Sequence, residues 1–172
     1  MTHRTHPPLS PAEFTARFDE ARRAHVSKDF KRARQLYENL ISLSPGEPGP
    51  QVMLSDLDLR AGRLLTAKTR LEPLVATHPE SEPLRNALAR ILEELGDAKA
   101  SEGFYREDVA RTPDSVGAWA KLAHALQVGG KIDDAAVLYR QMTDRRPDSV
   151  PGYFGLAGTE PKGLPDAEPG GG

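Results

Sequence analysis

Four prolines recur at a strict spacing of 34 residues, and this spacing constrains the fold more than any other feature of the chain. They are Pro45, Pro79, Pro113 and Pro147. Each follows a stretch with the apolar spacing of an amphipathic helix, and proline ends a helix because it lacks a backbone N–H and clashes with the preceding turn. The spacing therefore predicts four copies of one helical unit that stack in sequence.

Two further positions keep the phase of these prolines. Twelve residues before each proline the chain has a small residue, and eight residues before it a large one. The small residues are Ala33, Ala67, Ser101 and Ala135, and the large ones are Tyr37, Leu71, Tyr105 and Tyr139. Small side chains let neighbouring helices approach closely, while large ones fill the remaining space. We therefore expect each unit to bury its second helix at a repeated helix crossing.

The last full unit shows a pair of helices most clearly. Within residues 116–147, two amphipathic stretches flank a Gly-Gly turn, and Trp119, Leu122 and Leu126 mark the apolar stripe of the first. Ser115 is the predicted N-cap of that helix. One helical hairpin of this size cannot bury both of its stripes, so the unit requires neighbours of its own kind.

The beginning of the chain and its second unit carry local signals. Ser10-Pro11-Ala12-Glu13 forms a predicted capping box with proline at the first helical position, so a helix should run from Pro11 to about Val26. The second helix of the second unit, residues 64–77, contains Pro73. An interior proline costs about 3 kcal/mol or more. This helix is therefore predicted to be kinked or broken near Glu72.

The 34-residue period, the paired helices, the small residues at the crossing, the aromatic residue in the second helix and the closing proline together resemble the tetratricopeptide repeat. The resemblance covers residues 14–147 and implies an all-α, right-handed α-solenoid of helix-turn-helix repeats. We expect the solenoid at 10–157, with repeats at about 14–47, 48–81, 82–115 and 116–149 and a partial fifth helix at 149–157. Residues 1–9 and the Gly- and Pro-rich residues 158–172 are predicted to be disordered tails.

Composition excludes several classes of site. The chain has no cysteine, which excludes disulfides, thiol nucleophiles and thiolate metal sites. Its net charge is -2, and no segment is basic enough to form a footprint for nucleic acid. The sequence shows neither a signal peptide nor a run of apolar residues long enough to span a membrane, so we expect a cytoplasmic location and no membrane partner.

No pattern in the sequence is typical of an active site, a cofactor site or a metal site. No pair of its five histidines has the spacing of metal ligands on a helix. Gly129-Gly130-Lys131 lacks the rest of a phosphate-binding loop. The basic residues Lys31, Arg32 and Arg34 lie beside acids on one predicted helix, which favours solvated ion pairs. We therefore expect no enzyme activity, no cofactor and no metal.

The resemblance also implies a concave groove lined by the first helix of each repeat. The positions opposite the packing stripe are Phe18, Arg22, His25, Val26, Val52, Asp56, Leu59, Arg60, Asn86, Arg90, Glu93, Glu94, Ala120, His124, Gln127 and Val128. The candidate binding residues among them are Arg22, His25, Asp56, Arg60, Asn86, Arg90, His124 and Gln127. The three arginines recur at related places and are suited to binding carboxylates of a peptide. The competing interpretation is an inner face that is merely solvent-exposed.

Together these inferences predict a non-catalytic scaffold for protein–protein interaction that binds a peptide or protein segment in the groove. An alternative is the amino-terminal repeat region of a larger enzyme, because bacterial proteins that join such repeats to a sulfotransferase-like domain have a similar arrangement. A third hypothesis is self-association through apolar residues at the open end of the array.

Overall fold

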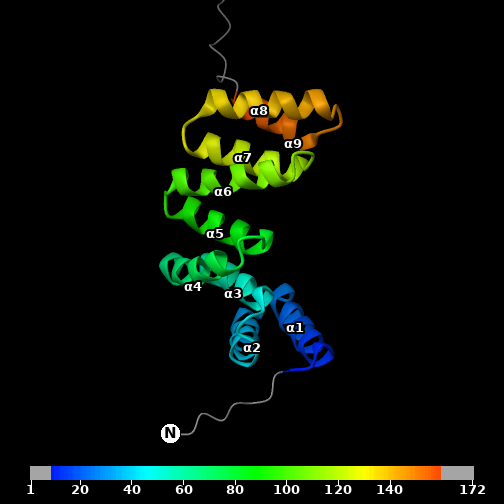
Figure 1. Ribbon diagram of the computed structural model, residues 1–172, viewed down its shortest axis with the longest axis vertical. Coiled ribbons are helices and arrows are strands. Elements are labelled where there is room, and N and C mark those ends of the chain that lie inside the picture. Colours follow the sequence, from blue (N-terminus) through cyan, green and yellow to red (C-terminus); the bar gives the residue numbers. More distant parts are fainter. Residues whose placement is uncertain (1–8, 160–172) are drawn as a thin grey trace, which may run out of the picture. The chain divides into compact units, whose positions relative to one another are not determined.

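The computed structural model describes residues 9–159, and every regular element in that range is an α-helix. The helices are α1 (Pro11–Val26), α2 (Phe30–Leu43), α3 (Pro48–Arg60), α4 (Leu64–Thr77), α5 (Glu82–Glu94), α6 (Ala98–Arg111), α7 (Val116–Val128), α8 (Ile132–Arg145) and α9 (Val150–Thr159) (Figure 1). The tails predicted at 1–9 and 158–172 lie almost wholly outside the described residues. Within those residues, α9 extends two positions beyond the predicted end of the partial fifth helix.

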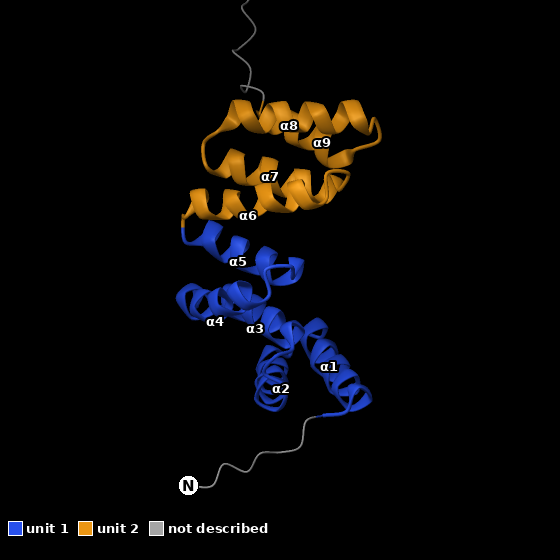
Figure 2. Ribbon diagram, in the orientation of Figure 1, with its two compact units in different colours: residues 1–95 blue, residues 96–172 orange. Residues whose placement is uncertain are grey.

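The chain divides into two compact units, residues 1–95 with α1 to α5 and residues 96–172 with α6 to α9 (Figure 2). In the first unit, α2 packs against α1 and α3, while α3 also contacts α4 and α5. In the second unit, α7 contacts α6, α8 and α9, and α8 contacts α9. The predicted repeat at 82–115 spans the division between the units.

The predicted helix caps are present. The Glu13 N–H donates to the Ser10 hydroxyl oxygen at 3.3 Å, and the Ser10 N–H donates to the Glu13 carboxylate at 3.0 Å, which completes the capping box of α1. Pro11 lies in the first turn, as predicted. In the second unit the Ala118 N–H donates to Oγ of Ser115 at 3.2 Å. Both caps give a polar partner to an N–H that the helix itself leaves unpaired.

The burial predicted from the period is confirmed in both units. The four small residues twelve positions before the prolines, Ala33, Ala67, Ser101 and Ala135, are fully buried. The four large residues that follow them, Tyr37, Leu71, Tyr105 and Tyr139, are buried as well. The second helices therefore present their small and large positions to the core, as the repeated crossing requires.

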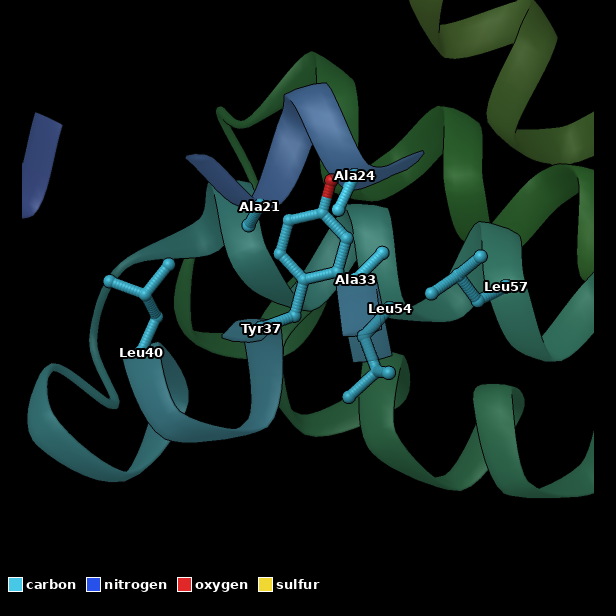
Figure 3. Packing of buried hydrophobic residues seen from close by; sticks show 7 residues of the cluster. All are labelled: Ala21, Ala24, Ala33, Tyr37, Leu40, Leu54 and Leu57. Carbon is cyan, nitrogen blue, oxygen red and sulfur yellow. The ribbon is translucent and has the colours of Figure 1, made fainter. Parts of the chain in front are cut away.

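The core of the first unit forms around Tyr37 of α2. Its ring is fully buried and points toward Ala21 and Ala24 of α1. Ala33 and Leu40 of α2 and Leu54 and Leu57 of α3 complete the cluster (Figure 3). Burying one large apolar side chain contributes about 1.5–3 kcal/mol. This cluster holds α1, α2 and α3 together. It therefore determines which faces of these helices point away from the core.

Helix α4 is continuous from Leu64 to Thr77 with Pro73 inside it, so of the two predicted alternatives, a kink or a break near Glu72, the break does not occur. Pro73 lies on the exposed side of the helix, whereas Ala67 and Leu71 on the opposite side are fully buried. Tertiary packing of that buried side supplies more stabilisation than local propensity, so the helix persists through the proline.

Candidate functional site

A cavity of about 370 Å³ opens in the first unit, between the first helices of its hairpins. Helices α1, α3 and α5 supply almost all of its lining, and α2 adds Tyr37. The lining residues are Arg22, His25, Val26, Tyr37, Val52, Met53, Ser55, Asp56, Leu59, Ala87, Arg90 and Ile91. The helices that the resemblance assigns to a groove therefore enclose one cavity in this unit.

The cavity combines apolar walls with a few charged groups. Val52, Met53 and Leu59 project from α3, and Ile91 projects from α5. Small-molecule and side-chain pockets in proteins share this composition, in which apolar surface supplies affinity and a few polar groups fix orientation. The arrangement is suited to holding one apolar group whose neighbours are polar.

Asp56 of α3 is the centre of the charged groups. Its carboxylate accepts a hydrogen bond from Nε of Arg60 at 2.7 Å and lies 3.5 Å from Nη1 of Arg90 and 3.4 Å from Nε2 of His25. The hydrogen bond and the charge of Asp56 raise the pKa of Arg60. Two of the arginines predicted to bind a partner's carboxylates are thus already paired with a carboxylate of this chain.

Tyr37 and His25 extend this group into the core. The Tyr37 hydroxyl lies 3.4 Å from Nδ1 of His25, on the other side of the imidazole ring from Asp56. Burial raises the pKa of Tyr37 to about 12, so the hydroxyl is protonated at neutral pH. The contacts orient the His25 ring at the cavity wall, and the protonated phenol is a poor nucleophile.

The predicted binding residues of the first unit do not all reach the cavity. Arg22, His25, Asp56 and Arg90 line it, and Arg22 also forms an exposed ion pair with Asp19 at 3.6 Å. The remaining two lie outside the lining. The Arg60 guanidinium lies over the Phe30 ring at 5.9 Å, and Nδ2 of Asn86 donates to the Glu82 carboxylate at 3.1 Å.

The other two predicted residues, His124 and Gln127, belong to α7 of the second unit. His124 is exposed. Gln127 accepts a hydrogen bond from the Tyr139 hydroxyl at 3.4 Å and donates to the carbonyl oxygen of Gly158 at 3.3 Å. Gln127 therefore links α7 to α8 and α9 within its own unit, which occupies its amide.

Sequence reasoning missed a buried charged cluster around Asp58 of α3. The Asp58 side chain is fully buried and accepts hydrogen bonds from Arg34 at 2.5 Å, Arg63 at 2.9 Å and Arg70 at 2.6 Å. Burial alone would raise the pKa of Asp58, but these three hydrogen bonds outweigh it and lower the pKa. The expectation of a merely solvated ion pair at Arg34 is wrong, because this arginine ties α2 to the interior of α3.

Residues 9–159 contain neither a candidate metal centre nor a candidate membrane span. In that part of the chain no three or more His, Cys, Asp or Glu side chains are grouped so that they could hold a metal ion. None of the helices in the same range has the length and apolar character needed to cross a membrane.

A family model described as tetratricopeptide repeat matches residues 27–91. That span runs from the turn before α2 into α5, so it contains most of the cavity's lining. The hairpin of α7 and α8, whose residues fit the repeat pattern best, lies outside the matched span. No curated protein sequence matches the chain significantly.

Several solved structures resemble the chain. A tetratricopeptide repeat protein from Parabacteroides merdae superposes with a TM-score of 0.76 at 14% identity over 88% of this chain, which spans 59% of that protein. MamA from Desulfovibrio magneticus superposes with a TM-score of 0.71 at 13% identity, covering 85% of this chain and 82% of MamA. YrrB, described as a tetratricopeptide repeat protein with an unusual peptide-binding site, superposes with a TM-score of 0.64 at 16% identity, covering 83% of this chain and 74% of YrrB. These likenesses confirm the predicted fold class.

Proposed function

We propose that this chain, which carries tetratricopeptide repeats and has their fold, is a protein-interaction scaffold whose first unit binds a segment of a protein partner. The observation that carries the proposal is the cavity between α1, α3 and α5, with its apolar walls and charged rim. YrrB, a protein of the same fold, has a peptide-binding site, which supports a similar use of the fold in this chain. Proteins built from this repeat are generally non-catalytic, and we propose the same for this chain.

The cavity is suited to one large apolar side chain of the partner. Its volume of about 370 Å³ falls within the range of small ligand pockets. Burying a Leu, Met or Phe side chain there would contribute about 1.5–3 kcal/mol, which is the size of an interface hot spot. The apolar anchor would then supply affinity, and the residues on either side of it would meet the charged rim.

The charged residues around the cavity would select partners by their charge. Asp56 limits this selection, because its carboxylate already pairs with two of the arginines. A carboxylate of the partner would have to compete with Asp56 for Arg60 and Arg90. Arg22 is the more available cation, because it is exposed and its ion pair with Asp19 is long. We therefore expect the anchor side chain to contribute more to affinity than the arginines do.

Filling the cavity tests this proposal. Peptides selected from a random library on the intact chain should share a large apolar residue, and Ala87→Phe should weaken their binding at least about tenfold, because the new ring occupies the anchor's place. Ala120→Phe, the same change on α7 of the second unit, is the matched control and should leave binding intact. Peptides that bind the Ala87→Phe variant as tightly as the unchanged chain would exclude this cavity as the anchor site.

The arginines are tested separately. Replacing Arg60 and Arg90 together with glutamine should weaken binding of peptides that carry an acid beside the anchor, while peptides with a neutral residue there should be affected less. Unchanged affinity for both kinds of peptide would remove the arginines from the site and leave the anchor cavity standing.

A second candidate function is self-association through α9, and the exposure of that helix favours it. Val150, Tyr153, Phe154 and Ala157 recur at the i, i+3, i+4, i+7 spacing of one helical stripe. Tyr153 is 55% exposed and Phe154 is 77% exposed. Exposed apolar stripes of this kind mark association surfaces.

The glycines of α9 explain why this stripe faces outward. A Cβ at Gly155 would lie 2.2 Å from the Tyr139 ring, and one at Gly152 would lie 2.8 Å from Thr143, so α9 packs on α8 through its glycine side. Sedimentation at several concentrations should show an oligomer that Phe154→Ser dissociates. Val137→Ser, which alters another exposed residue of the same unit, should not change the mass. A monomer at every concentration would exclude self-association.

A further inference from the structure

A second cavity of the first unit, of about 420 Å³, has mainly cationic side chains around it. The lining residues are Phe30, Lys31, Arg34, Leu57, Arg60, Ala61 and Arg63. They come from the first turns of α2, from the end of α3 and from the turn that follows α3. Four of these seven residues carry a positive charge at neutral pH, although the net charge of the whole chain is -2.

Carboxylates of the chain hold three of the four cations in place. Asp58 accepts from Arg34 and from Nε of Arg63, and Asp56 accepts from Nε of Arg60. The hydrogen bonds that Arg60 and Arg63 donate to described residues run through Nε, and these side chains are 58% and 47% exposed. Each guanidinium is therefore oriented through one nitrogen and keeps its outer donors for another acceptor.

Two of the acids beside this cavity are shared with arginines outside its lining. Lys31 is exposed and forms no ion pair with any described residue. Asp58 also binds Arg70, and Asp56 also lies against Arg90, so neither acid neutralises the lining by itself. Two further acids lie beside the lining. Glu38 pairs with Arg34 at 3.4 Å, and Asp29, the N-cap residue that precedes Phe30, accepts a hydrogen bond from the Arg32 N–H at 3.1 Å.

Phe30 adds an exposed apolar surface to the cavity. Its side chain is 40% exposed, the Arg60 guanidinium lies over its ring, and the His25 ring meets it edge-on at 5.8 Å. The Phe30 ring limits the space open to the Arg60 guanidinium, a group that can form two parallel hydrogen bonds to one carboxylate. The cavity thus presents oriented donors beside an apolar wall.

We propose that this cavity is a separate binding site, and that it takes the carboxylate groups of an acidic segment of a protein partner. Charge complementarity and the exposed guanidiniums of Arg60 and Arg63 support the assignment, and Lys31 adds a charge that pairs with no described residue. An acidic peptide is favoured over nucleic acid because the positive charge is confined to one cavity, whereas nucleic acid binding relies on cations distributed along many phosphates. The site shares Arg60 with the charged residues invoked in the proposed function, whereas Lys31, Arg34 and Arg63 do not line the inner cavity and distinguish the two sites.

Lys31→Glu is the central test, with a fluorescein-labelled hexaglutamate peptide as probe and anisotropy at low salt as the readout. The intact chain should bind the peptide, and the variant should bind at least about tenfold more weakly. Lys31 lies in the first turn of α2, where an acid interacts favourably with the helix dipole, so weaker binding would not reflect loss of the helix. Lys99→Glu, at an exposed lysine of α6 that is also without an ion pair among the described residues, makes the same charge change and should bind as the unchanged chain does.

Further probes separate the chemistry and the location of the site. Hexaglutamine should not bind, and added salt should weaken the binding of hexaglutamate. Ala87→Phe, which fills the inner cavity, should leave hexaglutamate binding unchanged. Equal binding by the Lys31→Glu variant and the unchanged chain would overturn the proposal, as would loss of binding in Ala87→Phe. A single-stranded oligothymidylate of equal charge that binds more tightly than hexaglutamate and depends on Lys31 would overturn the assignment to an acidic protein segment.

Discussion

Lys28 and Gly62 adopt the same left-handed backbone conformation at equivalent turns of successive hairpins, with φ of 63° and 70°. The turns match in their hydrogen bonds, because the N–H of Lys28 donates to His25 O at 3.0 Å and the N–H of Gly62 donates to Leu59 O at 3.0 Å. Glycine occupies the corresponding turns of the later hairpins, at Gly96 and Gly130, with φ of 79° and 78°. In the described part of the chain, Lys28 is therefore the only residue other than glycine at the left-handed position of these four turns.

Replacing Lys28 with glycine should stabilise the protein. A side chain in the left-handed region costs about 1–2 kcal/mol, and glycine adopts that region without a steric penalty. We expect the Lys28→Gly variant to raise the free energy of unfolding in urea by about 1 kcal/mol. Lys99→Gly, the same change in the first turn of helix α6, should not stabilise the protein. A destabilised Lys28→Gly variant would show that the lysine side chain makes a contribution that outweighs the strain.

Removing the charge of Asp58 should destabilise the first unit severely. Arg63 and Arg70 would then lose this counter-ion and, among the described residues, Arg34 would keep only Glu38, and breaking a buried pair typically costs about 3–5 kcal/mol. We expect Asp58→Asn to lower the midpoint of urea unfolding strongly. Asp56→Asn removes a carboxylate whose partners Arg60 and Arg90 are more exposed, and it should cost less. Equal losses in the two variants would contradict the central structural role of Asp58.

The pH dependence of stability provides a second test of Asp58. Its pKa in the folded protein lies below the ordinary value of 3.8, so its contribution to stability is complete above that value and is lost as the pH falls toward the folded pKa. Unfolding measured between about pH 5 and pH 2 should therefore show a loss of stability in the unchanged chain that is smaller in Asp58→Asn. If the unchanged chain and Asp58→Asn lost the same amount of stability as the pH falls, other carboxylates would be the cause of the acid sensitivity.

The sequence predicted those features that repeat or depend on neighbours along the chain. The 34-residue phase identified the buried crossing residues such as Ala33 and Ala135, because stacked units place equivalent positions in equivalent environments. The capping box at Ser10 and Glu13 was predictable for another reason, since its two partners are three residues apart. Both kinds of signal are local or periodic, and neither requires knowledge of how distant helices meet.

Local and periodic signals did not predict the inner cavity or the Asp58 cluster. The partners of Asp58 lie 24, 5 and 12 residues away from it, and no spacing of that kind marks a cluster in a sequence. Arg34 has an acid one turn away on its own helix, Glu38, so the local pattern favours a solvated pair there. The inner cavity depends on side chains from α1, α3 and α5 that converge in space. The sequence therefore indicated which helix faces line it. It did not indicate the cavity's volume or the ion pairs of Arg60 and Arg90 with Asp56.

The proline within α4 should lower the stability of the first unit. Pro73 cannot donate a backbone hydrogen bond inside the helix, and an interior proline costs about 3 kcal/mol. We expect Pro73→Ala to stabilise the chain by up to about 3 kcal/mol in urea unfolding. Pro48→Ala is the control, because Pro48 lies in the first turn of α3, where proline is tolerated, and it should bring no comparable gain. A similar gain in both variants would rule out the interior position as the cause.

Gly155 should be intolerant of a side chain. A Cβ at this position would lie 2.2 Å from the Tyr139 ring, which is buried, so α9 would have to move away from α8. We expect Gly155→Ala to cost about 1–3 kcal/mol and to increase amide hydrogen exchange in α9. Gly103→Ala has open space around the new methyl group and lies within α6, so it should stabilise by up to about 1 kcal/mol. Unchanged exchange in α9 of Gly155→Ala would contradict this close packing.

The central claim, that the first unit holds an anchor side chain between α1, α3 and α5, is tested most directly by methyl NMR on the intact chain. Titration with a library-selected peptide should shift the methyl resonances of Met53 and Ile91, which line the cavity, and leave those of Met142 in the second unit in place. A peptide whose apolar residue is replaced by alanine should no longer produce the shifts. Shifts confined to the second unit, or a peptide that binds without perturbing Met53 and Ile91, would contradict the claim.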